Sequence, residues 1–186
     1  MFLDLIGGYS GNPMEKINEH IEYLENKTSE EKETLDAANE NRDSAYETYT
    51  YVKNIFDRNS SDMTALKNKI KMLELERDAA VKAAVEEAKA AGKSQTEIDR
   101  ISDEVYNRHS AGINLVMYQM VESTKNYKLS SINSDEAESA YRKSRFDSTS
   151  ASNKYISGLR YLEGVYLYKG KLQQQSIFLA NTQKLS

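Results

Sequence analysis

Apolar and small side chains recur at alternating steps of three and four residues through the first half of the chain. The repeat holds for about ten heptads with few polar interruptions. Its positions are Met14, Ile17, Ile21, Leu24, Thr28, Glu31, Leu35, Ala38, Arg42, Ala45, Tyr49, Val52, Phe56, Asn59, Met63, Leu66, Ile70, Leu73, Arg77, Ala80 and Ala84. A repeat of this length is typical of a left-handed coiled coil. Because Asn12 can cap the start and Pro13 suits the first turn, the pattern predicts a helix over residues 14–91.

The polar stretch Arg58–Met63 is a candidate break in this helix, with Ser60 or Ser61 as the N-cap of a following helix. The heptad frame crosses the stretch without a change of phase, and no glycine or proline interrupts it. A loop would have no reason to preserve the frame. We therefore expect a continuous helix with local fraying at this point.

A stop signal and a start signal lie side by side near the middle of the chain. Gly92 follows an alanine-rich segment, and glycine most often adopts the left-handed conformation that ends a helix. Ser94 and Glu97 then form a capping box, in which each side chain bonds the other residue's backbone amide. The apolar stripe resumes at Ile98. The chain is therefore predicted to turn back over residues 92–94.

The second long helix is predicted over residues 95–155, followed by a Tyr-rich segment, residues 156–186, that continues the helix to about Phe178. Its stripe is less regular than the first, with an eleven-residue spacing at Val105, Val116 and Tyr127. The stripe positions are Ile98, Ile101, Val105, Ile113, Val116, Met117, Met120, Tyr127, Ala137, Ala140, Tyr141, Ser144, Ser148, Ala151 and Tyr155. A further capping box, Asn133 with Glu136, leaves open whether this helix breaks there.

A turn at Gly92 would place residue i opposite roughly residue 185 minus i. Residues 15–47 carry eleven acidic and four basic side chains, whereas residues 139–186 carry eight basic and two acidic ones, so the pairing joins opposite charges. It also sets Ala38 and Ala45 against three small residues, Ala140, Ser144 and Ser148. We therefore predict an all-α fold, a long antiparallel coiled-coil helical hairpin. The alternative is an elongated four-helix bundle with breaks near Ser60, Gly92 and Asn133.

Composition limits the chemistry that such a chain can perform. Hydrophobic residues make up 39% of the chain and charged residues 29%, which suits a thin seam between helices better than a thick core. The absence of cysteine excludes disulfides and thiolate sites. His20 and His109 lie in different arms, and neither belongs to a Glu-x-x-His motif. With no phosphate-binding loop or nucleophile motif, we expect no catalytic, cofactor or metal site and no enzymatic activity.

The two ends of the chain are the candidate assembly site. The N-terminal segment, residues 1–13, is apolar and glycine-containing, and the C-terminal segment carries apolar residues on more faces than one helix can cover. Tyrosine, of which the chain has thirteen, is enriched at subunit interfaces, and packing between the two arms of the same chain is the alternative role for these rings. The predicted self-assembly interface comprises Phe2, Leu3, Leu5, Ile6, Tyr161, Val165, Tyr166, Tyr168, Leu172, Ile177 and Phe178.

These features favour a non-enzymatic structural coiled-coil subunit that forms a homo-oligomer through its terminal segments. The layout resembles filament and tip subunits of type III secretion systems, which also lack cysteine and pair their terminal helices, and a virion component is a further context. One alternative is an adaptor or chaperone that grips another protein with the Tyr-rich tail. Another is a membrane-active helical protein that inserts Phe2–Ile6, although Asp4 interrupts that patch.

Other partners and the location follow from the same patterns. Nucleic acid is not expected as a partner, because the basic C-terminal region already faces an acidic segment of the same chain. No apolar run of about 18 residues is present to span a membrane. The start of the chain lacks the basic region of a signal peptide, so we expect a cytoplasmic protein or one exported without a cleaved leader.

Overall fold

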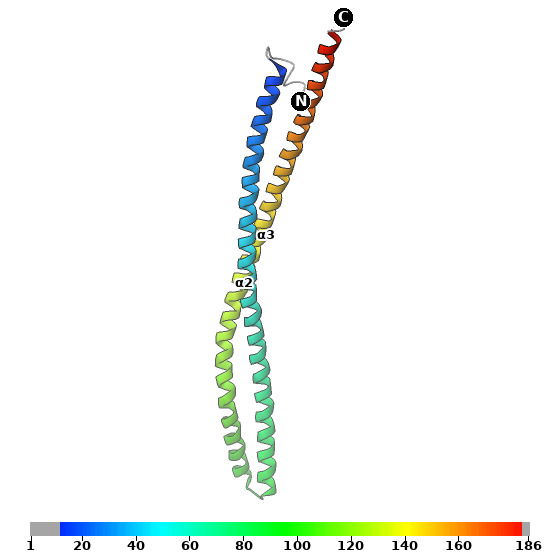
Figure 1. Ribbon diagram of the computed structural model, residues 1–186. Helices are drawn as coiled ribbons and strands as arrows, with labels where there is room; N and C mark the ends of the chain where they lie inside the picture. The colour runs from blue at the N-terminus through cyan, green and yellow to red at the C-terminus, as the bar shows by residue number, and fades with distance from the viewer. Residues whose placement is uncertain (1–11, 184–186) are drawn as a thin grey trace. The chain divides into compact units, whose positions relative to one another are not determined.

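The computed structural model describes residues 12–183, which form two long helices packed against each other (Figure 1). Helix α2 spans Pro13–Ala90 and helix α3 spans Gln95–Gln183. The predicted all-α helical hairpin is confirmed. The predictions for Phe2, Leu3, Leu5 and Ile6 lie outside the described residues.

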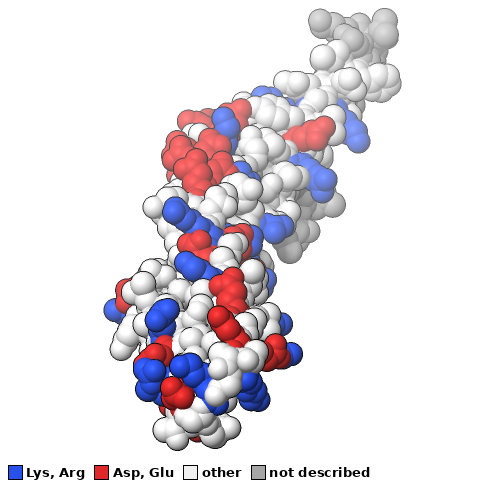
Figure 2. Space-filling model, turned by 90° about the horizontal axis from the view of Figure 1, so that it is seen from below, with Lys and Arg blue, Asp and Glu red and all other residues white. Residues whose placement is uncertain are grey.

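The chain divides into two units, and each is a pair of antiparallel helix segments. The terminal unit combines the first part of α2, up to residue 46, with the part of α3 from residue 140 onward. The turn unit comprises residues 47–139. Each unit therefore contains segments that are distant in the sequence. Figure 2 shows acidic and basic side chains intermixed over the face of the molecule turned to the viewer.

Neither of the two candidate breaks interrupts a helix. Helix α2 runs through Arg58–Met63, and helix α3 runs through Asn133. The four-helix alternative is therefore wrong. Pro13 is the first helical residue, and the Asn12 side-chain oxygen accepts a hydrogen bond from the Met14 amide at 3.1 Å, as the capping pattern predicted.

The turn has the geometry that its sequence predicted. Gly92 has a φ of +67°, in the left-handed region. The Gly92 amide donates to the Lys89 carbonyl at 3.0 Å and the Lys93 amide to the Ala88 carbonyl at 3.1 Å, which together form a Schellman motif. These bonds satisfy carbonyls that the end of α2 would otherwise leave unpaired.

The capping box begins α3 directly after this motif. The Ser94 amide donates to the Glu97 carboxylate at 3.1 Å, and the Glu97 amide donates to the Ser94 hydroxyl at 3.4 Å. The bond from the Ser94 backbone is the main cause that lowers the pKa of Glu97, followed by the Ser94 side chain and the charge of Lys93. The bond to the carboxylate is thus strongest when Glu97 is ionised.

The predicted seam of α2 is confirmed along its whole length. Every heptad position from Met14 to Ala84 is buried or half-buried. The seam of α3 differs from the predicted stripe at Met117, which is 51% exposed, and at Ala140, which is also exposed. The predicted contact of Ala140 with the small residues of α2 is therefore wrong, whereas Ser148 is buried.

The register between the two helices agrees with the predicted pairing, in which residue i lies opposite roughly residue 185 minus i. The ring centroids lie 5.2 Å apart in two aromatic pairs, Tyr46 with Tyr141 and Phe56 with Tyr127. The Ser148 hydroxyl donates a hydrogen bond to the Asn39 side-chain oxygen at 2.7 Å. The contacting pairs are Asn39 with Ser148, Tyr46 with Tyr141, Phe56 with Tyr127 and Asn59 with Asn126. Each pair lies within about two positions of that rule. The acidic start of α2 thus lies beside the basic part of α3 in the terminal unit.

Candidate self-assembly surface

The seam of the terminal unit contains a compact apolar cluster. Three residues of α2, Ile17, Ile21 and Leu24, surround Val165 of α3, and all four are at most 6% exposed. Because each side chain lies at a seam position, burial follows directly from the heptad spacing. This cluster ties the start of α2 to the C-terminal part of α3.

Three residues of the predicted interface complete this internal packing. Val165 is only 1% exposed, and Tyr168 and Leu172 are half-buried against the cluster. Helix α2 of the same chain already covers the face on which they lie. We therefore leave these three out of the surface that is offered to a partner.

The other four predicted residues of this helix remain accessible. Tyr161 is 47% exposed and Tyr166 44% exposed, while Ile177 and Phe178 are 61% and 71% exposed. Tyr166, Ile177 and Phe178 lie on faces of α3 that the cluster does not use, whereas Tyr161, four residues before Val165, lies at the edge of the seam.

The two tyrosines are held by contacts with α2. The Tyr161 ring meets the His20 ring edge-on at 6.0 Å. The Tyr166 hydroxyl donates a hydrogen bond to the Glu25 carboxylate, and this bond is the main cause that raises the pKa of Tyr166. Each ring is thereby oriented while nearly half of the residue's surface is exposed.

Sequence reasoning left three further exposed residues out of the predicted interface. Leu167 is 64% exposed, and Ile156 and Leu159 are 41% and 40% exposed. A signal for two of them was present, because Ile156, Leu159 and Tyr166 follow steps of three and seven residues, which keep them on one helix face. We define the terminal surface as the exposed residues Ile156, Leu159, Tyr161, Tyr166, Leu167, Ile177 and Phe178.

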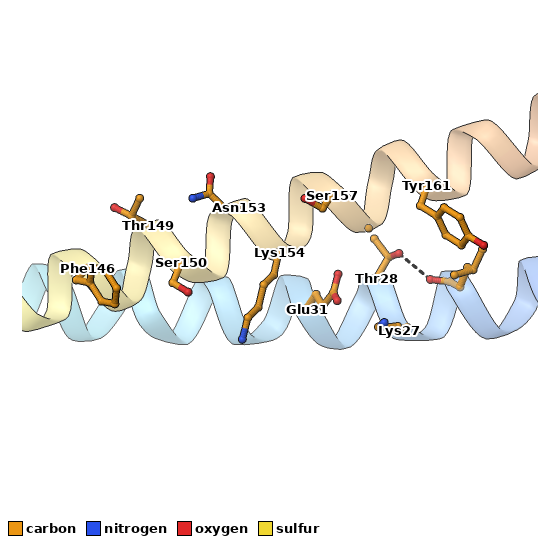
Figure 3. A pocket seen from close by; sticks show the side chains of 12 residues that line it. Lys27, Thr28, Glu31, Phe146, Thr149, Ser150, Asn153, Lys154, Ser157 and Tyr161 are labelled. Atoms are coloured by element: carbon orange, nitrogen blue, oxygen red, sulfur yellow. Dashed lines mark hydrogen bonds between the residues drawn. The ribbon is translucent and has the colours of Figure 1, made fainter. Parts of the chain in front are cut away.

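A groove of about 590 Å³ lies between α2 and α3 in the terminal unit (Figure 3). Glu31 points from α2 toward α3, and Lys154 points from α3 toward α2. One Glu31 carboxylate oxygen is buried without a hydrogen-bond partner. Gly158 makes room for it, since a Cβ atom there would meet that oxygen. The groove thus contains a seam carboxylate whose desolvation is not compensated by a hydrogen bond.

Replacing Glu31 with leucine is expected to raise the free energy of unfolding by about 1 kcal/mol, because it removes the unpaired buried oxygen and adds apolar area to the seam. Glu30→Leu is the matched control, since Glu30 is exposed and its replacement should change stability by less than about 0.5 kcal/mol. Urea unfolding followed by circular dichroism measures both variants. A loss of stability in Glu31→Leu would mean that the carboxylate is favourable where it lies.

Residues 12–183 also bear on metal binding and on membrane insertion. No group of three or more His, Asp or Glu side chains in this part of the chain is arranged to hold a metal ion. His20 belongs to the terminal unit and His109 to the turn unit. Neither of the two described helices contains a stretch long and apolar enough to cross a membrane.

The candidate site is therefore a surface rather than a pocket with defined chemistry. Its members are exposed apolar side chains on α3 of the terminal unit, next to a seam that α2 fills. Comparison of the chain with family models, curated proteins and solved structures finds no match in any of the three.

Proposed function

We propose that this chain is a non-enzymatic structural subunit that self-associates through the terminal surface. The observation that carries the proposal is the set of seven apolar side chains, each 40–71% exposed, on a short part of α3 whose inner face is already packed. Large apolar patches on a soluble protein mark interaction sites, because leaving them in water forfeits the free energy of burial.

A second copy of the same chain is the partner that we propose. Homo-oligomers are the commonest assemblies of soluble proteins, and a surface shared by all copies needs no other component. Tyrosine suits such a surface, since its ring can be buried while its hydroxyl keeps a polar partner, as Tyr166 does with Glu25. Filament or tip subunits of secretion systems and virion components are the contexts in which we expect it.

The test is the substitution Ile177→Lys in the full chain, with Met72→Lys as the matched control. The two side chains are equally exposed, at 61%, but Met72 lies outside the terminal surface. Wild-type protein should form assemblies as concentration rises, and Ile177→Lys should raise the concentration needed by about tenfold, which corresponds to about 1.4 kcal/mol. Met72→Lys should behave as wild type. Sedimentation velocity and negative-stain electron microscopy over a concentration series measure the effect.

Three results would contradict the proposal. A wild-type chain that stays monomeric at every concentration would remove self-assembly and direct attention to a foreign partner for the Tyr-rich tail. Equal effects of Ile177→Lys and Met72→Lys would show that assembly does not use the terminal surface. Wild-type binding to liposomes that Ile177→Lys abolishes, without self-association, would favour a membrane-active protein.

A further inference from the structure

The α3 segment of the turn unit carries a second apolar stripe that faces away from α2. Leu115 and Tyr118 are 63% and 77% exposed, and Leu129 and Ile132 are 59% and 56% exposed. These residues belong to one set with alternating steps of three and four, which we call the outer stripe: Leu115, Tyr118, Glu122, Lys125, Leu129 and Ile132. All six side chains are exposed.

The position of this stripe explains why α2 cannot cover it. Seam residues Ile113 and Val116, both 4% exposed, lie two positions before Leu115 and Tyr118. Two residues correspond to a rotation of about 200° around a helix of 3.6 residues per turn. The outer stripe therefore lies on the opposite side of α3 from the seam, where a coiled-coil hairpin normally has polar residues.

A shallow groove adjoins the stripe and enlarges the apolar area. Tyr118 and Lys125 line it together with Val121, which is 69% exposed. Lys67 and Ile70 of α2 form its other side. A helix placed along the outer stripe would thus also meet apolar surface at its edge.

Read in the reverse direction, the outer stripe has apolar residues at the same four positions and the opposite charge at each of its two central positions. Two apolar residues are followed by an acid, a base and two apolar residues. We propose that a second copy of this chain packs antiparallel on the outer stripe, with a two-fold axis between residues 123 and 124. In this register each residue meets a complementary one, as follows: Leu115 with Ile132, Tyr118 with Leu129, and Glu122 with Lys125.

Charge complementarity selects this occupant and this orientation. The two-fold axis forms the Glu122–Lys125 pair twice, once on each side. Parallel in-register packing would instead place glutamate against glutamate and lysine against lysine, which is unfavourable. Four of the six positions bury apolar side chains in the antiparallel register, which satisfies the pattern of a short coiled-coil seam.

This contact goes beyond the proposed function and does not depend on it. The outer stripe lies in the turn unit, whereas the terminal surface lies in the terminal unit. A closed two-fold dimer through the outer stripe buries that stripe and leaves the terminal surface of each chain exposed. A chain that has both can build an extended assembly, because every dimer still presents two terminal surfaces.

The first experiment measures the mass of the full chain carrying Ile177→Lys, so that the terminal contact is weakened. This protein should form a dimer in sedimentation equilibrium. Adding Leu115→Lys should leave only monomer, whereas adding Leu75→Lys should leave the dimer unchanged. Leu75 is the matched control, since it is also 63% exposed but lies on α2 outside the stripe. A monomeric Ile177→Lys chain, or equal effects of the two leucine substitutions, would overturn the contact.

The outcomes of the two proposals are distinguishable in this experiment. If the terminal surface is not used, Ile177→Lys will form assemblies as large as those of wild type. If the outer stripe is not used, Ile177→Lys will be monomeric, or Leu115→Lys and Leu75→Lys will have equal effects on its remaining association. Each proposal therefore fails through a different observation.

The second experiment tests the register by cross-linking, which the cysteine-free chain allows without background. Tyr118→Cys and Leu129→Cys are prepared as separate full-length variants. Under mild oxidation each alone should stay uncross-linked, because identical positions are about 16 Å apart along the axis, at 1.5 Å per residue. An equimolar mixture should form the disulfide-linked heterodimer. Cross-linking of either variant alone, or none in the mixture, would overturn the antiparallel register.

The third experiment exchanges the central charges. Glu122→Lys alone and Lys125→Glu alone place like charges together and should each weaken the dimer several-fold. The double exchange restores two opposite-charge pairs and should return the dimer constant to within about twofold of its starting value. Failure of the double exchange to recover the dimer would contradict the Glu122–Lys125 pairing.

Discussion

Replacing Val165 with aspartate is expected to lower the free energy of unfolding of the terminal unit by about 4 kcal/mol. Val165 is 1% exposed and is surrounded by Ile17, Ile21 and Leu24, so a carboxylate there would be buried without a charged partner or hydrogen bond from these side chains. The seam is thin, and the isolated helix segments would be marginal in water without it.

Leu167→Asp is the control for this substitution. Leu167 lies two residues further along α3 and is 64% exposed, so aspartate there should change the stability of the unit by less than about 0.5 kcal/mol. It should instead weaken self-association through the terminal surface. The two variants therefore separate the packing of the chain from its assembly.

Hydrogen exchange with peptide-level mass spectrometry is the measurement that resolves the two units. In the Val165→Asp variant, backbone amides of residues 13–46 and 140–183 should lose their protection against hydrogen exchange. Amides of residues 47–139 should keep their protection and provide an internal reference. Unchanged protection at Val165→Asp would contradict the burial of this side chain. Loss of protection in both variants alike would show that Leu167 is also packed within the chain.

The first helix and the pairing register could be predicted because their signals are redundant. The heptad frame of α2 runs from Met14 to Ala84 without a change of phase, and every position in it is buried or half-buried. The turn at Gly92 is specified twice, by a glycine that ends one helix and by a capping box that begins the next. Once the turn is known, an antiparallel pairing has only one register.

The seam of α3 was harder to predict, because many of its positions are not apolar. Ser130 and Ser148 are 3% and 6% exposed, and Ser148 is satisfied there by its hydrogen bond to Asn39. A pattern of apolar residues cannot show such positions, and it places an exposed methionine, Met117, on the stripe instead. From Val105 to Val116 the seam advances through His109 and Ile113 by steps of four, four and three residues, which produces the eleven-residue spacing seen in the sequence.

The candidate surface could be predicted only as a region. Apolar residues occur on several faces of the C-terminal segment, and the sequence does not reveal which of these faces α2 covers. Val165, Tyr168 and Leu172 lie on the covered face, whereas Ile177 and Phe178 do not. The outer stripe is hard to predict for a related reason, because its residues are interleaved in the sequence with those of the seam.

Replacing Gly92 with alanine is expected to lower the free energy of unfolding by about 1–2 kcal/mol, since the φ of +67° is strained for any residue with a Cβ atom. Gly92→Val should cost more, because branched side chains are rarely found in this region. A Cβ atom at Gly92 would meet no other atom within 4 Å, so the effect comes from the backbone alone. Urea unfolding at one low protein concentration measures the three proteins.

Gly112→Ala is the matched control, and its effect should have the opposite sign. Gly112 lies inside α3, has an ordinary helical backbone and also has no atom within 4 Å of an added Cβ, so the same chemical change should stabilise the chain by about 1 kcal/mol. A sign difference between identical substitutions cannot arise from side-chain contacts, since neither position has any. It would follow from the backbone conformation at residue 92 and therefore from the turn. If both substitutions stabilise the chain, residue 92 is helical in solution and the hairpin does not form there.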